Sequence, residues 1–379
     1  MADKQISFYP VGNGFSALLN LDDDTNILFD INQFEEEERE KNKYWDIHDN
    51  LLDDLPITDN RRHLSVLCIS HAHNDHCRGV DDVFYLPKQN EDAEELIHID
   101  ELWVPADIFT DDVEAEAEMI KKEAQRRLKL ADTGEAENKG NRLVVFGRKK
   151  DFSDLQKLPR EQRPVAGEIF KKICGESRSD FEAFVHCPFA EESDDKNNES
   201  IILQVCIKAP KGSWNYFLIG GDARCAIWGK VYDETKKHAR LERLNWDIFA
   251  VPHHGSYSFF SEKSREDARD NPDERSMKII ERGNDGCELV CSSRPIKEKN
   301  YADEDPPHIQ AVKHYRETAE DKSGEFICLM EYPDEDKPKP LVFRFTDGGP
   351  QKKSIGTIAS VAITNKASAS TPRYGLLTQ

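Results

Sequence analysis

The sequence contains no long hydrophobic run. No apolar stretch approaches the length of a membrane span, and residues 1–5 lead into a predicted strand rather than into the apolar segment of a signal peptide. The nine cysteines are an odd number and include no CxxC pair, which favours reduced thiols. We therefore expect a soluble, cytoplasmic protein that does not bind membranes.

Positive charge is also scarce. The chain has 52 Lys and Arg residues against 73 Asp and Glu residues, which gives a formal net charge of −21. Such a chain repels polyanions at long range and lacks the counterion-release term that drives non-specific nucleic-acid binding. Any nucleic-acid substrate must therefore be held by local contacts and metal. One basic stretch, residues 148–178, is either a phosphate-contact surface or a solubilising loop.

Four side chains of the kinds that bind metal ions lie within six positions, directly after the apolar run Val66–Ser70. They are His71, His73, Asp75 and His76. Neutral imidazole and carboxylate are the ligands that suit zinc and its first-row neighbours, and a turn of backbone can aim alternate side chains at two adjacent ions. Their order after a buried-type strand favours a metal site over a chance surface loop.

This segment resembles the HxHxDH signature of the metallo-β-lactamase fold superfamily. Three further blocks are similar to the family and occur in the expected order: residues 11–30 as two opening strands, Tyr216–Asp222 ending in Gly-Gly-Asp, and Asp247–Ser256. The last block contains the "HHGS" element of the branch that includes the hydrolase domain of the DNA-uptake competence protein. The resemblance covers roughly residues 6 to 345.

The resemblance implies an α/β fold, an αββα sandwich in which two mixed β-sheets lie face to face with helices outside. The recurring short β-type runs, separated by helical stretches, agree with such a layered domain. We expect one hydrolase domain over residues 1–346, with insertions near 33–60, 108–140 and 147–183. Residues 347–379 are predicted to form a polar, flexible tail with one edge strand near 357–364.

The resemblance also implies a ligand set for two Zn²⁺ ions, with Mn²⁺ or another divalent metal as the alternative. His71, His73, Asp75 and His76 would bind them, and Asp222 would bridge them. A third histidine precedes the bridging aspartate in the wider family, and His186 is the only candidate here. It is either a ligand or a core histidine bonded to backbone, because the competence-like branch carries Asn and Ser at this point, as in residues 197–200.

The remaining second-metal ligand is open at this level. His253 and His254 are candidates, one of them binding metal while its neighbour donates a hydrogen bond or a proton to substrate oxygen. His308 could also reach the site. Arg224 and Arg294 could each steady an anionic oxygen, although surface salt bridges are the usual fate of such residues.

These residues predict a metal-dependent hydrolase, foremost a phosphodiesterase or nuclease that attacks DNA or RNA with a metal-activated hydroxide oriented by Asp75. An alternative is a hydrolase of a small ester, lactone, thioester or nucleotide messenger, which the acidic composition favours. A second alternative is a non-catalytic metal-binding subunit that works with a protein partner in a multi-component system. Fold alone does not choose among them.

Overall fold

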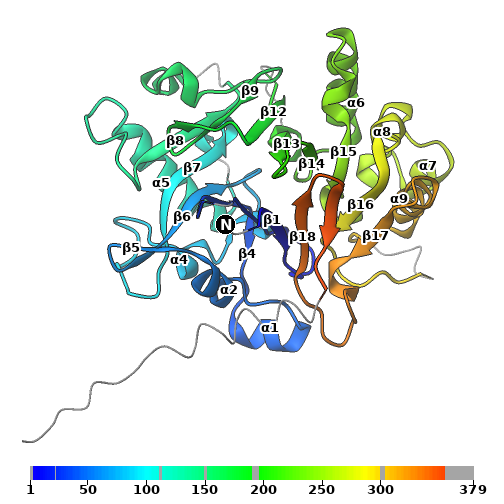
Figure 1. The fold of residues 1–379 in the computed structure, drawn as a ribbon, viewed down its shortest axis with the longest axis horizontal. Helices are drawn as coiled ribbons and strands as arrows, with labels where there is room; N and C mark the ends of the chain where they lie inside the picture. Colours follow the sequence, from blue (N-terminus) through cyan, green and yellow to red (C-terminus); the bar gives the residue numbers. More distant parts are fainter. Residues whose placement is uncertain are drawn as a thin grey trace, which may run out of the picture.

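Two β-sheets lie face to face, and helices cover both outer faces (Figure 1). The structure is a computed structural model that describes residues 3–21, 23–110, 113–148, 152–189, 196–298 and 304–354. This arrangement confirms the predicted αββα sandwich. None of the helices in these ranges is both long and apolar enough to cross a membrane. No disulfide joins any of the nine cysteines, all of which lie in the same ranges.

The first sheet has the strand order β19-β18-β1-β2-β3-β6-β7-β8, with β5 paired to β6. Neighbours are antiparallel as far as β3 and parallel from β3 to β8. The strands are β1 (Gln5–Phe8), β2 (Ala17–Asn20), β3 (Asn26–Phe29), β5 (Ile57–Thr58), β6 (Arg61–Cys68), β7 (His98–Pro105), β8 (Arg142–Phe146), β18 (Leu341–Thr346) and β19 (Gly349–Lys352). Because β18 pairs with β1, this sheet joins both ends of the predicted domain.

The second sheet has the order β17-β16-β15-β14-β13-β12-β9. It is parallel from β17 to β14 and antiparallel from β14 to β9. Its strands are β9 (Ile169–Phe170), β12 (Phe181–Cys187), β13 (Ile202–Lys208), β14 (Trp214–Ile219), β15 (Trp246–Ala250), β16 (Gly283–Cys291) and β17 (Glu325–Cys328). The short strands β4 (Ile31–Asn32), β10 (Lys172–Ile173) and β11 (Glu176–Ser177) lie outside both sheets.

The strand order of one sheet repeats in the other. In each sheet three parallel pairings follow a run of antiparallel ones, four in the first sheet and three in the second, so that β3 corresponds to β14 and β6 corresponds to β15. The carboxyl ends of these four strands therefore occupy matching positions. All of the candidate metal ligands that cluster in space follow three of these strands, β6, β14 and β15.

Three apolar clusters hold the layers together. One lies between the sheets and takes side chains from both, such as Phe29 and Phe217, whose ring centroids are 5.9 Å apart. The second packs α2 (Ile47–Asp54), α4 (Val80–Val83) and α5 (Ala115–Lys129) on the first sheet. The third packs α6 (Cys225–Lys237), α7 (Arg265–Asp270), α8 (Glu274–Ile280) and α9 (Ile309–Asp321) on the second.

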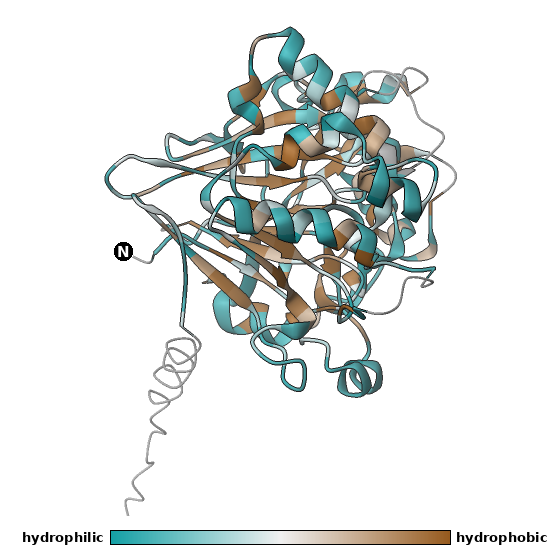
Figure 2. Ribbon diagram, turned by 90° about the vertical axis from the view of Figure 1, so that its right-hand side faces the viewer, coloured by the Kyte–Doolittle hydropathy of each residue, from teal (hydrophilic) through white to brown (hydrophobic). Residues whose placement is uncertain are grey.

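Hydropathy follows these layers. The strands are mostly apolar, while the helices turn polar faces outward (Figure 2). Helix α5 shows the local cause, because Ala117, Ile120 and Ala124 recur at helical spacing and are all fully buried. Helix α1 (Glu36–Asn42) buries no residue and is a solvated acidic segment.

One predicted boundary is wrong. Residues 349–352 form β19 and pair with β18, so the sheet continues into the region predicted as tail. The sequence Gly-Pro-Gln-Lys has no apolar alternation, which is why it was not predicted as a strand. An edge strand with solvent on its outer side does not need that alternation. The strand predicted near 357–364 lies outside the described residues.

Candidate metal centre

The loop between β6 and the short helix α3 (Asn74–Cys77) carries the first group of candidate ligands. Its shape is fixed by contacts with α5. The Asn74 amide donates to Glu114 Oε2 at 2.8 Å, and Asn74 Oδ1 accepts from the Glu116 amide at 3.0 Å. The Asp75 carbonyl also accepts from the Phe15 amide at 3.3 Å. The loop therefore has little freedom to move its imidazoles.

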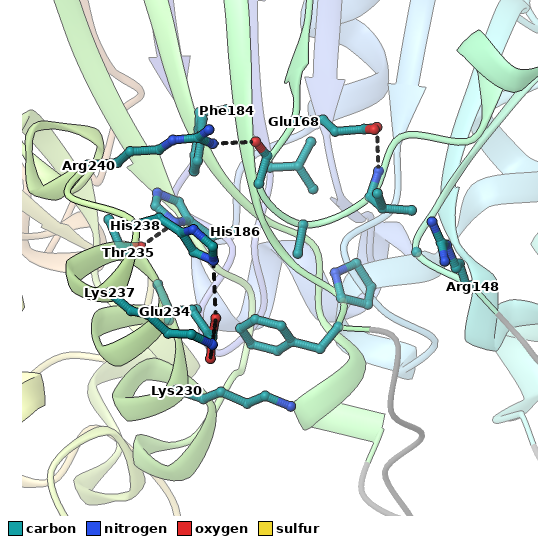
Figure 3. Close-up of a pocket in the computed structure, with 18 residues that line it drawn as sticks. Arg148, Glu168, Phe184, His186, Lys230, Glu234, Thr235, Lys237, His238 and Arg240 are labelled. Atoms are coloured by element: carbon teal, nitrogen blue, oxygen red, sulfur yellow. Dashed lines mark hydrogen bonds and ion pairs between the residues drawn. The ribbon is translucent and has the colours of Figure 1, made fainter.

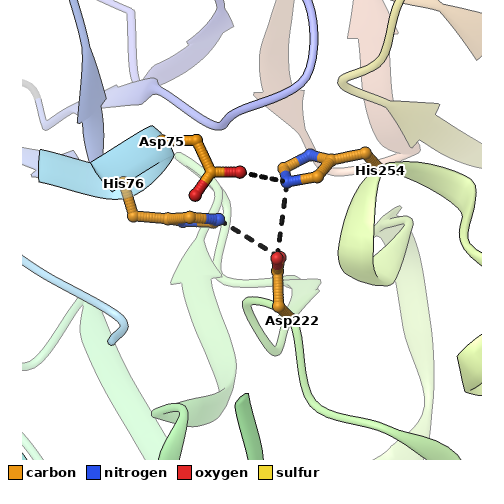
Figure 4. A group of neighbouring side chains, drawn as sticks. All are labelled: Asp75, His76, Asp222 and His254. Atoms are coloured by element: carbon orange, nitrogen blue, oxygen red, sulfur yellow. Dashed lines mark hydrogen bonds and ion pairs between the residues drawn. The ribbon is translucent and has the colours of Figure 1, made fainter. Parts of the chain in front are cut away.

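The structure brings six of the predicted ligands together in two groups that share Asp222. One group is Asp75, His76, Asp222 and His254, and the other is His71, His73 and Asp222. Within each group the ligand atoms lie within 4.8 Å of one another. Figure 4 shows the four side chains of the first group pointing toward a common centre. Asp222 is thus the residue that belongs to both groups.

The hydrogen bonds around these histidines leave lone pairs at the centre. His76 Nδ1 donates to Asp30 Oδ2 at 2.7 Å, so its Nε2 lone pair faces Asp222 Oδ1 at 3.2 Å. Ser70 Oγ donates to Asp30 Oδ2 at 2.6 Å and can then accept from His71 Nδ1 at 3.0 Å. His71 Nε2 is consequently also an acceptor.

Three of these buried atoms have no hydrogen-bond partner among the described residues: His71 Nε2, His76 Nε2 and Asp222 Oδ1. Unpaired buried acceptors are costly, and a cation bound between the members of a converging set would satisfy them. Imidazole nitrogen and carboxylate oxygen are the donors that divalent first-row metals take. The residues present therefore fit a pair of divalent metal ions.

The supporting carboxylate Asp30 was not predicted as a functional residue. It follows β3, is fully buried, and accepts the Ser70 amide at 2.6 Å in addition to Ser70 Oγ and His76 Nδ1. A carboxylate that accepts from the far nitrogen of a ligand histidine fixes its tautomer and orientation. The only signal in the sequence is the acidic residue at the end of an apolar strand.

The second sheet supplies the His253–His254 turn just after β15. His253 (φ 49°), His254 (φ 53°) and Gly255 (φ 78°) are consecutive left-handed residues. That conformation costs roughly 1 to 2 kcal/mol for each non-glycine residue. Strain of this kind persists where surrounding contacts impose it and is common at functional sites.

The turn gives its two imidazoles different surroundings. His254 Nε2 lies 3.1 Å from Asp75 Oδ2 and 3.4 Å from Asp222 Oδ2, inside the first ligand group. His253 Nε2 lies 3.7 Å from Asp222 Oδ2, outside both groups, and its Nδ1 is 3.0 Å from Ser258 Oγ. The side chain of His253 is 21% exposed against 5% for His254. His253 is thus the imidazole that substrate can reach.

The pKa values of the ionisable groups at the centre are shifted in different directions. Burial lowers the pKa of His71 well below its usual value, and the neighbouring His76 lowers it further. Burial also acts to lower the pKa of His254, but Asp222 and Asp75 outweigh it and raise that pKa to about 10. Three histidines hold the pKa of Asp222 well below its usual value in spite of burial. The anionic Asp222 carboxylate is therefore available at any ordinary pH.

His186 is not at the centre. It points to the outer face of the second sheet, where its Nε2 is 2.9 Å from the Arg243 carbonyl. Its Nδ1 is 3.5 Å from Thr235 Oγ1 (Figure 3). The cause is strand alternation, because Ala183 and Val185 face the core between the sheets. The prediction that it binds metal is wrong, and the alternative of a core histidine bonded to backbone holds.

Three further predicted residues lie near the turn but outside both ligand groups. His308 Nδ1 accepts from the Tyr257 amide at 3.2 Å, and its Nε2 is 3.2 Å from the Glu304 carbonyl. Arg294 donates from Nη2 to the Pro306 carbonyl at 3.0 Å. His308 and Arg294 therefore brace loops and are not brought to the ligand groups. Arg224 lies at the start of α6. Burial lowers the pKa of His253, and the positive charges of His254 and Arg224 lower it further.

Comparison with known proteins gives distant structural neighbours only. No family model matches the sequence, and no curated protein matches it. The crystal structure of human tRNase Z, short form, is 13% identical with a TM-score of 0.34, over 76% of this chain and 92% of that chain. Unliganded yeast PDE1 is 8% identical with a TM-score of 0.35, over 86% and 98%. Both scores are low, so the fold assignment depends on this chain's own strand order.

Proposed function

We propose that this protein is a metal-dependent phosphodiesterase that hydrolyses nucleic acid, with two Zn²⁺ ions held by the groups that share Asp222. The observation that carries the proposal is the convergence of unpaired His71 Nε2, His76 Nε2 and Asp222 Oδ1 on one centre. The chemistry that paired divalent ions supply is activation of water and neutralisation of charge on both oxygens of an in-line displacement. Phosphodiesters suit such a centre particularly well.

The residues of the chain have separate roles in this proposal. His71 and His73 would hold one ion, while Asp75, His76 and His254 would hold the other. Asp222 belongs to both groups. Asp75, whose side chain is 31% exposed, can also orient the attacking water by accepting its hydrogen bond. His253 Nε2 lies 3.7 Å from Asp222 Oδ2, and the His253 side chain is partly exposed. His253 would donate a hydrogen bond to the leaving oxygen.

Purified protein loaded with Zn²⁺ or Mn²⁺ tests the proposal on bis(p-nitrophenyl) phosphate, single-stranded DNA, duplex DNA and RNA. We expect hydrolysis of the small diester and of at least one polymer. His73→Ala and Asp75→Ala should lose nearly all activity and keep the fold. The matched control is His98→Ala, at a surface histidine paired with Asp92, and it should keep both activity and fold. Full activity in His73→Ala or Asp75→Ala would contradict the assignment.

The net charge of −21 favours one competing function, hydrolysis of a small ester or nucleotide messenger. Turnover of bis(p-nitrophenyl) phosphate without cleavage of any polymer would support it. Bound metal with no turnover on any substrate would instead support a non-catalytic subunit that acts with a protein partner.

A further inference from the structure

A cavity lined by none of the residues in the two ligand groups lies between β12 and the C-terminal half of α6 (Figure 3). Its volume is about 600 Å³, within the roughly 300 to 1000 Å³ of sites that bind small ligands or single groups. Phe184 and the buried His186 form part of the wall, and Gly167 lies beside them, because its amide donates to the Val185 carbonyl at 2.7 Å. A duplex is too wide for such a space.

The cavity is cationic on a strongly acidic chain. Arg148, Lys230, Lys237 and Arg240 line it, against Glu168 and Glu234. Both carboxylates are already engaged. Glu234 pairs with Lys237 and His238, while Glu168 pairs with Arg160 and accepts the Val165 amide. Positive charge is therefore in excess at this place.

Two arginines carry that excess. Arg148 is exposed and Arg240 donates from Nη1 to the Gly167 carbonyl at 2.9 Å, and neither forms an ion pair with a described carboxylate. In Figure 3 Arg148, Arg240 and Lys230 stand on three different sides of the space. Guanidinium groups placed in this way suit the bidentate recognition of phosphate.

Aromatic surface accompanies the charge. The Lys230 ammonium lies 4.3 Å from the centroid of the Phe189 ring, and Phe184 packs on His186 with centroids 4.8 Å apart. Proteins that bind single strands combine a positively charged groove with aromatic rings on which bases stack. The cavity lining contains both elements, positive charge and aromatic rings, which is what a nucleotide, with its phosphate and base, requires.

Helix α6 connects this cavity to the metal centre. Asp222 lies three residues before its first residue, Cys225, and the cavity is lined by the stretch from Lys230 to Lys237. With a rise of about 1.5 Å per residue, that stretch lies roughly 8 to 18 Å along the helix from its start. A single ligand that reaches both places must be a chain of several units.

We propose that this cavity binds one nucleotide of a single-stranded nucleic acid, several units away from the phosphodiester at the metal centre. The proposal rests on the proposed function, which it narrows to single strands. It also explains how a protein of net charge −21 can hold a polyanion, since the attraction is confined to one site on α6, the helix that begins three residues after Asp222.

Fluorescence anisotropy tests this with a fluorescein-labelled single-stranded DNA of about 20 nucleotides, long enough to cover such a site. The protein is kept loaded with metal, and the oligonucleotide carries phosphorothioate linkages that resist hydrolysis, so the result does not depend on turnover. We expect Arg148→Ala/Lys230→Ala to bind about tenfold more weakly, with the slope of log affinity against log salt reduced by about 1 to 2. Lys122→Ala/Lys129→Ala, which removes two exposed lysines of α5, is the matched charge control and should bind like wild type.

Phe189→Leu is a second variant that keeps all charges and most of the apolar packing. It should weaken binding by roughly tenfold, because a base loses its stacking partner. Wild-type affinity in both cavity variants would overturn the proposal, as would equal affinity for duplex DNA. Saturation of the cavity by a nucleoside monophosphate that does not compete with the oligonucleotide would overturn it too. Binding through the cavity without any hydrolysis would support this site and refute the proposed function.

Discussion

Asp30 and Asp222 occupy corresponding places in the two sheets but differ in their contacts. Each follows the strand at which antiparallel pairing changes to parallel pairing, β3 in one sheet and β14 in the other. Asp30 accepts hydrogen bonds from Ser70 and His76. Asp222 Oδ1 has no hydrogen-bond partner in the described part of the chain, and its carboxylate faces four imidazoles.

This difference separates a supporting carboxylate from a metal-binding one. A carboxylate whose lone pairs are filled by amide, hydroxyl and imidazole donors fixes its neighbours in place. A buried carboxylate with an open lone pair needs a cation. Position in the fold makes the two residues alike, and only their hydrogen-bond partners assign their roles.

The largest expected effect is at Asp222, the metal-binding carboxylate of the two. Asp222→Asn should reduce hydrolysis on the order of 10³-fold or more and lower the number of bound metal ions, because both ligand groups lose their shared anion. Metal analysis beside initial rates measures this. Asp247→Asn, a carboxylate of β15 that accepts the Tyr216 amide at 2.7 Å, is the matched control and should keep its metal. If Asp222→Asn retained all of its metal, Asp222 would be a supporting carboxylate like Asp30 and not a metal ligand.

A second prediction compares two buried histidines. His71→Ala should lose one equivalent of metal, since it removes an unpaired Nε2 from the centre. His186→Ala should keep every equivalent and only lower the melting temperature, because its nitrogens contact Arg243 and Thr235. Metal counts and thermal melting on both variants make the comparison. Loss of metal from His186→Ala would restore it as a ligand.

A smaller effect is expected at the supporting carboxylate. Asp30→Asn should weaken metal affinity about 10- to 100-fold while the number of sites stays the same, as is usual when a partner of a ligand histidine is changed. Competition with a chelator of known affinity measures it. An effect as large as that of Asp222→Asn would mean that Asp30 is more than a support.

The smallest effect concerns the strained turn after β15. His253→Gly should be more stable than His253→Ala by about 1 kcal/mol, because glycine adopts the positive φ of 49° without steric cost. Both variants lack the imidazole and should lose activity equally. Chemical denaturation checks the difference in unfolding free energy. Equal stability would show that the turn relaxes once the imidazole is gone.

The layers of the fold were predictable because apolar alternation and helical spacing are local. Helix α5 and the strand before His71 could be read from their own residues. The matching strand order of the two sheets could not be predicted from the sequence, since it does not come from a repeated sequence. Strand β19 was missed because it is polar and lies at an edge.

The site divides in the same way. The ligands at 71–76 are contiguous, and Asp222 follows an apolar strand, so both were visible in the sequence. Asp30 was not visible as a support, because its partners Ser70 and His76 lie 40 and 46 residues away. His186 also follows an apolar run, but strand alternation turns it to the opposite face, under α6.

The cluster draws on both halves of the sandwich, since residues 71–76 follow β6 of one sheet while Asp222 and His254 follow β14 and β15 of the other. Bound cations would consequently hold the two sheets together at the edge where these loops meet. Metal binding and the packing of the two sheets are then thermodynamically linked. A change that weakens the packing between the sheets releases the ions, and removal of the ions weakens that packing.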